Sequence, residues 1–240
     1  MGEACSCTSA LRRAGLQFAS YPFDWIAGLT FVERASIVHS HFDSFLTIAD
    51  LKDTNNTNGD PENPCQIYYN QKTGVMHNHD FPVGIPLEIS FPKVETKYKN
   101  RCNRLYQTIE QAQTVLAVYI ETPIPTHPTI TDADIQQGHH LLAQTFPGKQ
   151  ISLLYLTNRV GKPEKIKISD NITRLYLDYK RKKPGGYDYS VDSQVLNKVF
   201  CDYRLNHSAW KRIRRLYWRF LAGFILSEQA RRRFKKRHHV

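Results

Sequence analysis

Residues 115–120 read VLAVYI, residues 151–156 read ISLLYL, and residues 132–146 between them read DADIQQGHHLLAQTF. The two short apolar runs have the length of strands, and the longer segment has the length of a helix. A strand, a helix and a second strand in this order predict a βαβ unit with parallel strands. We therefore expect an α/β or α+β fold with this unit at its core.

Further helices and a hairpin are predicted around this unit. Residues 4–14 have apolar side chains at helical spacing and end at Gly15, a plausible C-cap, which places Cys5 in or just before the first helical turn. Residues 66–69 and 75–79 flank a turn and predict a hairpin whose second strand delivers His77 and His79 to one face. The other expected elements are helices over 29–48 (one or a pair), 93–113, 193–203 and 210–226, strands over 166–168 and 175–177, and a polar surface loop over 53–64.

The composition excludes several classes of protein. A chain of 240 residues that is 41% hydrophobic can bury a full core, so it is not a disordered protein. It has no run of about 18 apolar residues and no basic flank followed by an apolar stretch at its start, which argues against a transmembrane helix and a signal peptide. Its five cysteines are odd in number and scattered, which favours a reducing compartment. We expect a cytoplasmic location.

The positive charge is concentrated at one end of the chain. The net charge is +11, of which residues 207–240 carry +10, with eleven Lys and Arg against the single acid Glu228. Residues 1–206 are nearly neutral, with a net charge of +1. The sequence therefore predicts a single domain over residues 1–206 and a basic helical extension over residues 207–240.

Several short motifs occur in a fixed order in the first half of the chain. Gly2-Glu3-Ala4-Cys5 is followed by Ser20-Tyr21-Pro22-Phe23-Asp24-Trp25, by His79-Asp80-Phe81, and by a helix with Lys97-Tyr98, Arg101 and Arg104. Over about residues 2–120 this pattern resembles a bacterial family described as papain-like cysteine peptidases of unknown function. Each motif alone is weak, but the joint match is specific.

The resemblance implies a Cys-His pair for acyl transfer, made of Cys5 and His79. A thiol at a helix N-terminus near an imidazolium is expected to have a lowered pKa, and the first backbone N–H groups would form an oxyanion hole. His79 would be the general base and later the proton donor to the leaving group. Asp24 and Asp80 are the two candidates for orienting it, although Asp80 is expected on the opposite strand face from His79.

Each of these residues also has a structural interpretation. A cysteine near a helix start is often packed in the core, and Cys7 is expected to be buried. Cys5, Cys7, His77 and His79 suggest a zinc site, but a Cys-x-Cys pair lacks the usual spacing of such sites, so we expect no metal. Lys97, Arg101 and Arg104 share one helix face, which is either solvated or an anion clamp.

The start of the chain departs from the family pattern. Members of the family place a hydrophobic strand and Ser-Leu directly before the Gly-x-x-Cys, whereas Met1 stands immediately before Gly2 here. The resemblance therefore leads us to expect either a start codon assigned too late or the loss of a strand that would fix Cys5.

The basic extension has three interpretations. Its apolar stripe and arginines suit the surface of an anionic bilayer, and the cluster over residues 231–237 would add to the attraction. The same stripe could instead pack on the domain. Binding to nucleic acid is the third interpretation, and it is disfavoured because residues 1–206 are nearly neutral.

We thus expect a peptidase or amidase of unknown peptide or amide substrate, without a cofactor. The competing hypothesis is a non-catalytic protein on the inner face of the membrane, associated with cell-envelope polysaccharide synthesis. The apolar stripe of the basic extension, on which this second hypothesis depends, consists of Ile213, Leu216, Tyr217, Phe220, Leu221 and Phe224.

Overall fold

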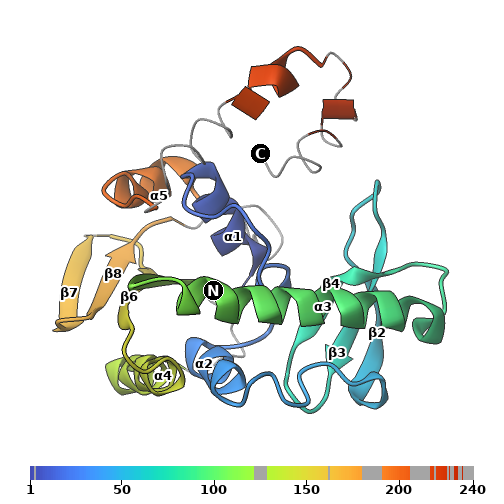
Figure 1. The fold of residues 1–240 in the computed structure, drawn as a ribbon, viewed down its shortest axis with the longest axis horizontal. Helices are drawn as coiled ribbons and strands as arrows, with labels where there is room; N and C mark the ends of the chain where they lie inside the picture. Colours follow the sequence, from blue (N-terminus) through green and yellow to red (C-terminus); the bar gives the residue numbers. More distant parts are fainter. Residues whose placement is uncertain are drawn as a thin grey trace.

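The computed structural model describes residues 1–2, 4–121, 129–161, 163–179, 191–205, 217–218, 220–225, 227, 230–231 and 234. The fold is mixed α/β, as expected, and its described strands form two four-stranded sheets (Figure 1). The helices are α1 (Cys5–Arg13), α2 (Phe31–His39), the 3₁₀ helix η1 (Ile48–Asp50), α3 (Leu87–Glu110), α4 (Asp132–Thr145) and α5 (Ser193–Phe200). The strands are β1 (Ile26–Ala27), β2 (Leu51–Thr57), β3 (Cys65–Asn70), β4 (Met76–Pro82), β5 (Thr114–Ile120), β6 (Gln150–Asn158), β7 (Glu164–Ser169) and β8 (Ile172–Leu177).

The mixed sheet contains the predicted βαβ unit. Its strand order is β5-β6-β8-β7, and β5, β6 and β8 are parallel, while β7 returns antiparallel to β8. Strand β5 continues through α4 into β6, which confirms the expected connection. The expected strands near 166–168 and 175–177 are β7 and β8.

The first two residues run along the outer side of β5. The amino group of Met1 donates to the carbonyl oxygen of Val118 at 2.8 Å. Gly2 lies beside the carbonyl of Ile120, which a Cβ at this position would approach to 3.5 Å. Because Met1 lies level with Val118 and Gly2 with Ile120, this segment runs parallel to β5. Helix α1 therefore begins at the carboxyl edge of the mixed sheet.

Helices cover both faces of the mixed sheet (Figure 1). On one face α1 and α5 pack against alternate residues of β5 and β6, including Ile120 and Leu156. On the other face α2 and α4 cover the intervening residues, including Tyr119 and Tyr155. This alternation follows from the two-residue period of a strand, and a sheet covered on both faces is the usual setting for parallel strands.

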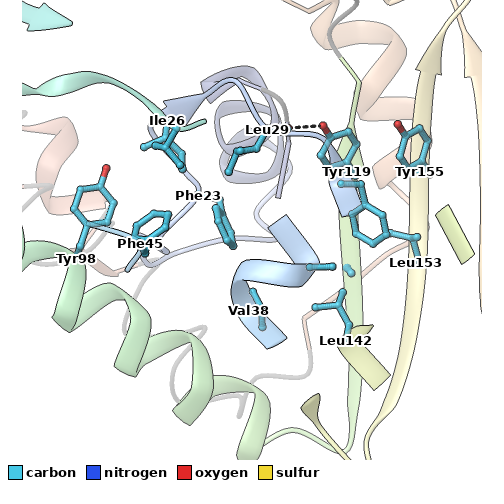
Figure 2. Close-up of a cluster of buried hydrophobic side chains, with 14 of the residues drawn as sticks. Phe23, Ile26, Leu29, Val38, Phe45, Tyr98, Tyr119, Leu142, Leu153 and Tyr155 are labelled. Atoms are coloured by element: carbon cyan, nitrogen blue, oxygen red, sulfur yellow. Dashed lines mark hydrogen bonds between the residues drawn. The ribbon is translucent and has the colours of Figure 1, made fainter. Parts of the chain in front are cut away.

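The core under α2 and α4 is built on aromatic rings (Figure 2). Tyr119 and Tyr155 stack with centroids 5.0 Å apart, and the Phe31 ring contacts both. The Tyr119 hydroxyl donates to the carbonyl of Leu29 at 3.0 Å, which joins the mixed sheet to the segment after β1. Gly138 permits the close approach of α4 to α2, since a Cβ there would lie 2.6 Å from the Phe31 ring.

The second sheet is antiparallel and contains the predicted hairpin. Its order is β1-β4-β3-β2, and β3 and β4 form the hairpin that carries the two histidines. Helix α3 packs along β4 and extends toward the mixed sheet (Figure 1).

Three predicted boundaries in this half of the chain are wrong. The loop expected over 53–64 is in part strand β2, which accommodates its polar sequence with a shift of register and a left-handed Asn55. The helix or helix pair expected over 29–48 is the single helix α2, which ends at His39 because left-handed residues follow at His41, Phe42 and Ser44. Helix α3 begins at Leu87 and contains Pro92, after which the predicted helix began.

The C-terminal predictions are tested only in part. No helix in the described ranges is long and apolar enough to cross a membrane. Most of the expected helix over 210–226 lies outside the described residues, although residues 217–218 and 220–223 are helical. The division into a domain over 1–206 and an extension over 207–240 stays a prediction.

Candidate functional site

Cys5 is the first residue of α1, as the sequence predicted, and it is partly exposed. Ala4 precedes it in an extended conformation and provides no side-chain cap. The first N–H groups of a helix lack i−4 partners. Cys7 N–H donates to the carbonyl of Ala4 at 3.4 Å, which leaves the earlier N–H groups of the turn as the donors available to a ligand. Cys5 thus combines a partly accessible thiol with backbone donors.

The expected lowering of the Cys5 pKa is wrong for this arrangement. Burial raises the pKa of the Cys5 thiol, and a backbone hydrogen bond lowers it only in part. Desolvation penalises the thiolate more than this hydrogen bond favours it. The neutral thiol is therefore the resting form. Cys7 is buried as expected, with its thiol 3.2 Å from the carbonyl of Met1.

A buried polar cluster lies under β4 and α3. Asp80 Oδ2 accepts from His77 Nδ1 at 2.8 Å and from the Tyr98 hydroxyl at 2.6 Å, and its Oδ1 pairs with Lys97. Burial by itself raises the pKa of Asp80, but the His77 hydrogen bond and the charges of His77 and Lys97 outweigh it and hold the pKa below its usual range. Burial raises the pKa of Tyr98, and the same carboxylate raises it further. Asp80 is thus an ionised centre inside the protein.

A bulge in β4 decides which histidine meets Asp80. Gln66 pairs with Phe81 and Tyr68 pairs with His77, so β4 contains two more residues than β3 over this stretch. The bulge breaks the two-residue alternation on which the prediction of a shared face for both histidines rested. His77 is 0% exposed and turns inward with Asp80, whereas His79 is exposed. From the sequence, His77 was a candidate for zinc binding only, and its pairing with Asp80 was not predicted.

His79 lies on the surface between two other segments. Its ring packs edge-on against Trp25 at 6.1 Å, and Asn58 Nδ2 lies 3.3 Å from its Nδ1. Asn58 Oδ1 accepts from the backbone N–H groups of Asp60 and Cys65, which turns the amide nitrogen toward His79. In the neutral ring Nδ1 is therefore the acceptor and Nε2 carries the proton.

Cys5 and His79 are connected only indirectly in the part of the chain that the structure describes, where no hydrogen bond joins Cys5 to His79 or to His77. Trp25, which contacts His79, lies 5.5 Å from the Arg12 guanidinium. Arg12 follows Cys5 by seven residues on the same face of α1, a rise of about 10 Å. One partly exposed surface therefore runs from Cys5 along Arg12 and Trp25 to His79.

Asp24 stabilises the turn in which it lies. Its Oδ2 accepts from Gln17 Nε2 at 2.6 Å and from the backbone N–H of Tyr21 at 2.8 Å. Arg12 lies 3.8 Å from the same oxygen. The carboxylate is buried and bonded to groups near it in the chain, so its observed contacts are those of a structural residue.

The basic face of α3 points back to the domain rather than to solvent alone. Lys97 pairs with Asp80, and the Arg101 guanidinium lies 5.4 Å from the centre of the Tyr98 ring. Arg104 donates to the carbonyl of Ser20 at 2.6 Å, which ties α3 to the segment before Asp24. Within the described ranges, no group of three or more His, Cys, Asp or Glu side chains could hold a metal ion.

Comparisons with known proteins agree with the motif pattern. The family model described as "Putative papain-like cysteine peptidase (DUF1796)" matches residues 1–137, which is more than half of the chain. "Uncharacterized protein R408" of Acanthamoeba polyphaga mimivirus is 28% identical over 118 residues, which cover 44% of this chain and 53% of the viral protein. The chain therefore spans about half the length of this curated relative, and no solved structure matches it. Its first 137 residues and their motifs show that the chain belongs to the papain-like cysteine peptidase family of that description.

Proposed function

We propose that the protein is a cysteine-dependent peptidase or amidase in which Cys5 is the nucleophile. The observation that carries this proposal is the partly exposed Cys5 at the start of α1, whose N-cap residue Ala4 makes no side-chain cap. An acyl carbon held next to this thiol would place its oxygen within reach of the first backbone N–H groups of the helix, which then stabilise the developing negative charge. Membership of the family supports the same chemistry.

His79 is the histidine that can serve this thiol. His77 is sealed in the core, whereas His79 is exposed on the same surface as Arg12 and Trp25. The Cys5 proton passes to His79 as sulfur attacks the acyl carbon, and His79 returns it to the departing amine. Water then hydrolyses the thioester. Because the resting thiol is neutral, the base must act during the attack and not before it.

Asn58 opposes this role in the resting arrangement. To accept a proton at Nε2, the neutral ring must carry its hydrogen on Nδ1, which Asn58 Nδ2 does not favour. The contact is long and exposed, so breaking it costs little. An Asp at this position would accept from Nδ1–H while still accepting from the N–H groups of Asp60 and Cys65.

The test is acetylation of Cys5 by p-nitrophenyl acetate, followed for each cysteine by peptide mass spectrometry. We expect faster acetylation at Cys5 than at the exposed Cys201, and a loss of about a hundredfold in His79→Ala. Asn58→Asp should increase the rate, and the exposed His140→Ala is the matched control that leaves it unchanged. Equal rates at Cys5 and Cys201, or equal rates in His79→Ala and the wild type, would refute the proposal.

A second function is favoured by the exposed aromatic residues near the C-terminus. Tyr217, Phe220 and Phe224 are 55%, 65% and 68% exposed, and they follow one another at helical spacing. We propose that this aromatic row contacts an anionic membrane surface. Serine at all three positions should abolish salt-sensitive binding to phosphatidylserine vesicles, while Val160→Ser, an exposed apolar site elsewhere, should not. Unchanged binding of the triple variant would exclude this role for the row.

A further inference from the structure

The carboxyl edge of the mixed sheet carries a second polar cluster, formed by Glu121, Thr157, Arg174 and Asp132. Glu121 directly follows β5, and Thr157 and Arg174 lie on β6 and β8. The strand register aligns Tyr155 with Arg174, and the backbone N–H of Glu121 donates to Leu156. Side chains two residues apart share a face, so these groups gather on the side of the sheet that α4 covers.

Arg174 organises this cluster. It is 6% exposed, and it donates to Asp132 Oδ1 at 2.7 Å, to the carbonyl of Ile130 at 3.2 Å and to Thr157 Oγ1 at 3.0 Å. Asp132 and Ile130 lie at the start of α4, so Arg174 fixes that start against the sheet. The guanidinium is engaged on all three nitrogens and is a scaffold for its neighbours.

Glu121 differs from the rest of the cluster because part of its carboxyl group is unused. Its Oε2 is shielded from solvent and has no hydrogen-bond partner among the described residues. Its backbone is held on both sides, by Leu156 and by the Tyr179 hydroxyl, which donates to the Glu121 carbonyl at 2.6 Å. Burial raises the pKa of Glu121, and hydrogen bonding by Thr157 and the charge of Arg174 offset this only in part. A buried acceptor without a donor is costly, and a ligand that donates to it removes that cost.

Cys5 lies at the same edge of the sheet. Gly2 is beside the carbonyl of Ile120, the residue before Glu121, and Cys5 follows Gly2 by three residues. Three residues span at most about 11 Å, so the Cα atom of Cys5 lies within that distance of Gly2, which itself lies beside the residue before Glu121. The chain leaves Gly2 toward α1 on one face and leaves β5 toward α4 on the other. Ligands of open α/β sheets bind outside the carboxyl ends of the strands where the chain diverges in this way.

We propose that Glu121 recognises the substrate of the Cys5 site, by accepting a hydrogen bond from an ammonium or amide N–H group of an acyl substrate whose carbonyl lies at Cys5. This inference rests on the proposed function. It extends that function by naming a cationic or N–H-donating peptide or amide as the preferred substrate class. Arg174 and Thr157 are positioning residues, because Arg174 holds the start of α4 and bonds to Thr157, which supports the Glu121 carboxyl group.

The test measures the charge preference of Cys5 toward two small thiol reagents. The probes are 2-(trimethylammonium)ethyl methanethiosulfonate and 2-sulfonatoethyl methanethiosulfonate, each of which forms a mixed disulfide and releases methanesulfinate. Rates at Cys5 are divided by those at the exposed Cys201 of the same chain. At low salt and pH 8, Glu121→Gln should lower the cation-to-anion rate ratio about two- to tenfold, the effect of one charge at a separation on the order of 10 Å. Glu121→Asp should retain most of the ratio.

The control is Glu164→Gln, which removes an exposed carboxylate at the start of β7 that pairs with Arg159. It should leave the ratio unchanged, and thermal unfolding establishes that each variant is folded. A ratio in folded Glu121→Gln equal to that of the wild type would overturn the inference. The proposed function fails separately, if Cys5 shows no faster acetylation than Cys201, whatever the charge ratio.

Discussion

Replacement of Asp80 by Asn tests the account of the buried cluster. The Asp80 side chain is 1% exposed, and its carboxylate accepts hydrogen bonds from His77, Tyr98 and Lys97. Asparagine has nearly the same shape but brings two N–H donors into a site where every neighbour is already a donor. The substitution therefore leaves the positive charge of Lys97 without its partner. An amide oxygen in the place of Oδ2 keeps the bonds from His77 and Tyr98 but turns the NH2 group toward Lys97, and the flipped amide loses the acceptor for both.

The expected cost follows from the burial of this pair. Removing one partner of a buried ion pair typically destabilises a protein by about 3–5 kcal/mol. For a chain of this size each kcal/mol shifts the midpoint of thermal unfolding by roughly 2–4 °C, so Asp80→Asn should lower it by about 10 °C. Tyr98→Phe removes a single bond to the charged oxygen and should cost about 1.5–3 kcal/mol. The control is Asp170→Asn, which breaks an exposed pair with Lys167 and should leave the midpoint unchanged.

The pH dependence gives an independent check. The folded-state pKa of Asp80 is lowered, so the stability it contributes is present above the pKa of the unfolded chain, about 4, and is lost as pH falls through the folded-state value. The gap between wild type and Asp80→Asn should be constant from pH 5 to 7 and shrink in acid, as urea titrations at a series of pH values would show. A gap below about 1 kcal/mol at neutral pH, or one that grows in acid, would refute this reasoning.

Three further predictions concern other parts of the fold. Gly138→Ala should destabilise the protein by about 1–3 kcal/mol in urea unfolding, because its Cβ would lie 2.6 Å from the Phe31 ring; an effect near zero would mean that α2 and α4 can separate freely. Because the pKa of Glu121 is raised in the folded chain, its stabilising contribution is present below the unfolded pKa and is lost as pH rises through the folded value. Glu121→Gln should therefore unfold at a higher temperature than the wild type at pH 8 but not at pH 4, in scanning calorimetry at the two pH values. Iodoacetamide alkylation of Cys5 should reach half its maximal rate above about pH 8.5, the value of an unperturbed thiol, with a short cysteine peptide as reference; a lower midpoint would contradict the effect of burial.

The elements that were predicted correctly are those whose signal is local. The apolar runs of β5 and β6 and the capped helix between them specify a βαβ unit without reference to the rest of the chain. The start of α1 at Cys5 and the left-handed Gly15 after it are likewise encoded by neighbouring residues. Long periodic segments bounded by caps and glycines can be assigned from sequence for this reason.

The errors come from features that depend on partners distant in sequence. Strand β2 is polar and rich in asparagine, and it is a strand because it pairs with β3. Pro92 lies inside α3 although proline usually disrupts a helix interior. The position of Glu121 near Cys5 depends on Met1 and Gly2 lying along β5, a contact between segments more than a hundred residues apart. No local pattern in the sequence reports such a contact.

The bulge in β4 explains why the different environments of His77 and His79 could not be predicted from the sequence. A regular strand would have placed His77 and His79 in similar environments, and Asp80 would have faced away from both. Two extra residues instead turn Asp80 onto His77, and His79 contacts an amide rather than a carboxylate. The group beside His79 Nδ1 is thus an amide, which does not orient the ring as the carboxylate of a catalytic triad does. Burial raises the pKa of the Cys5 thiol and so disfavours the thiolate. The proposed transfer of the Cys5 proton to His79 therefore has to take place during the attack on the substrate, not before it.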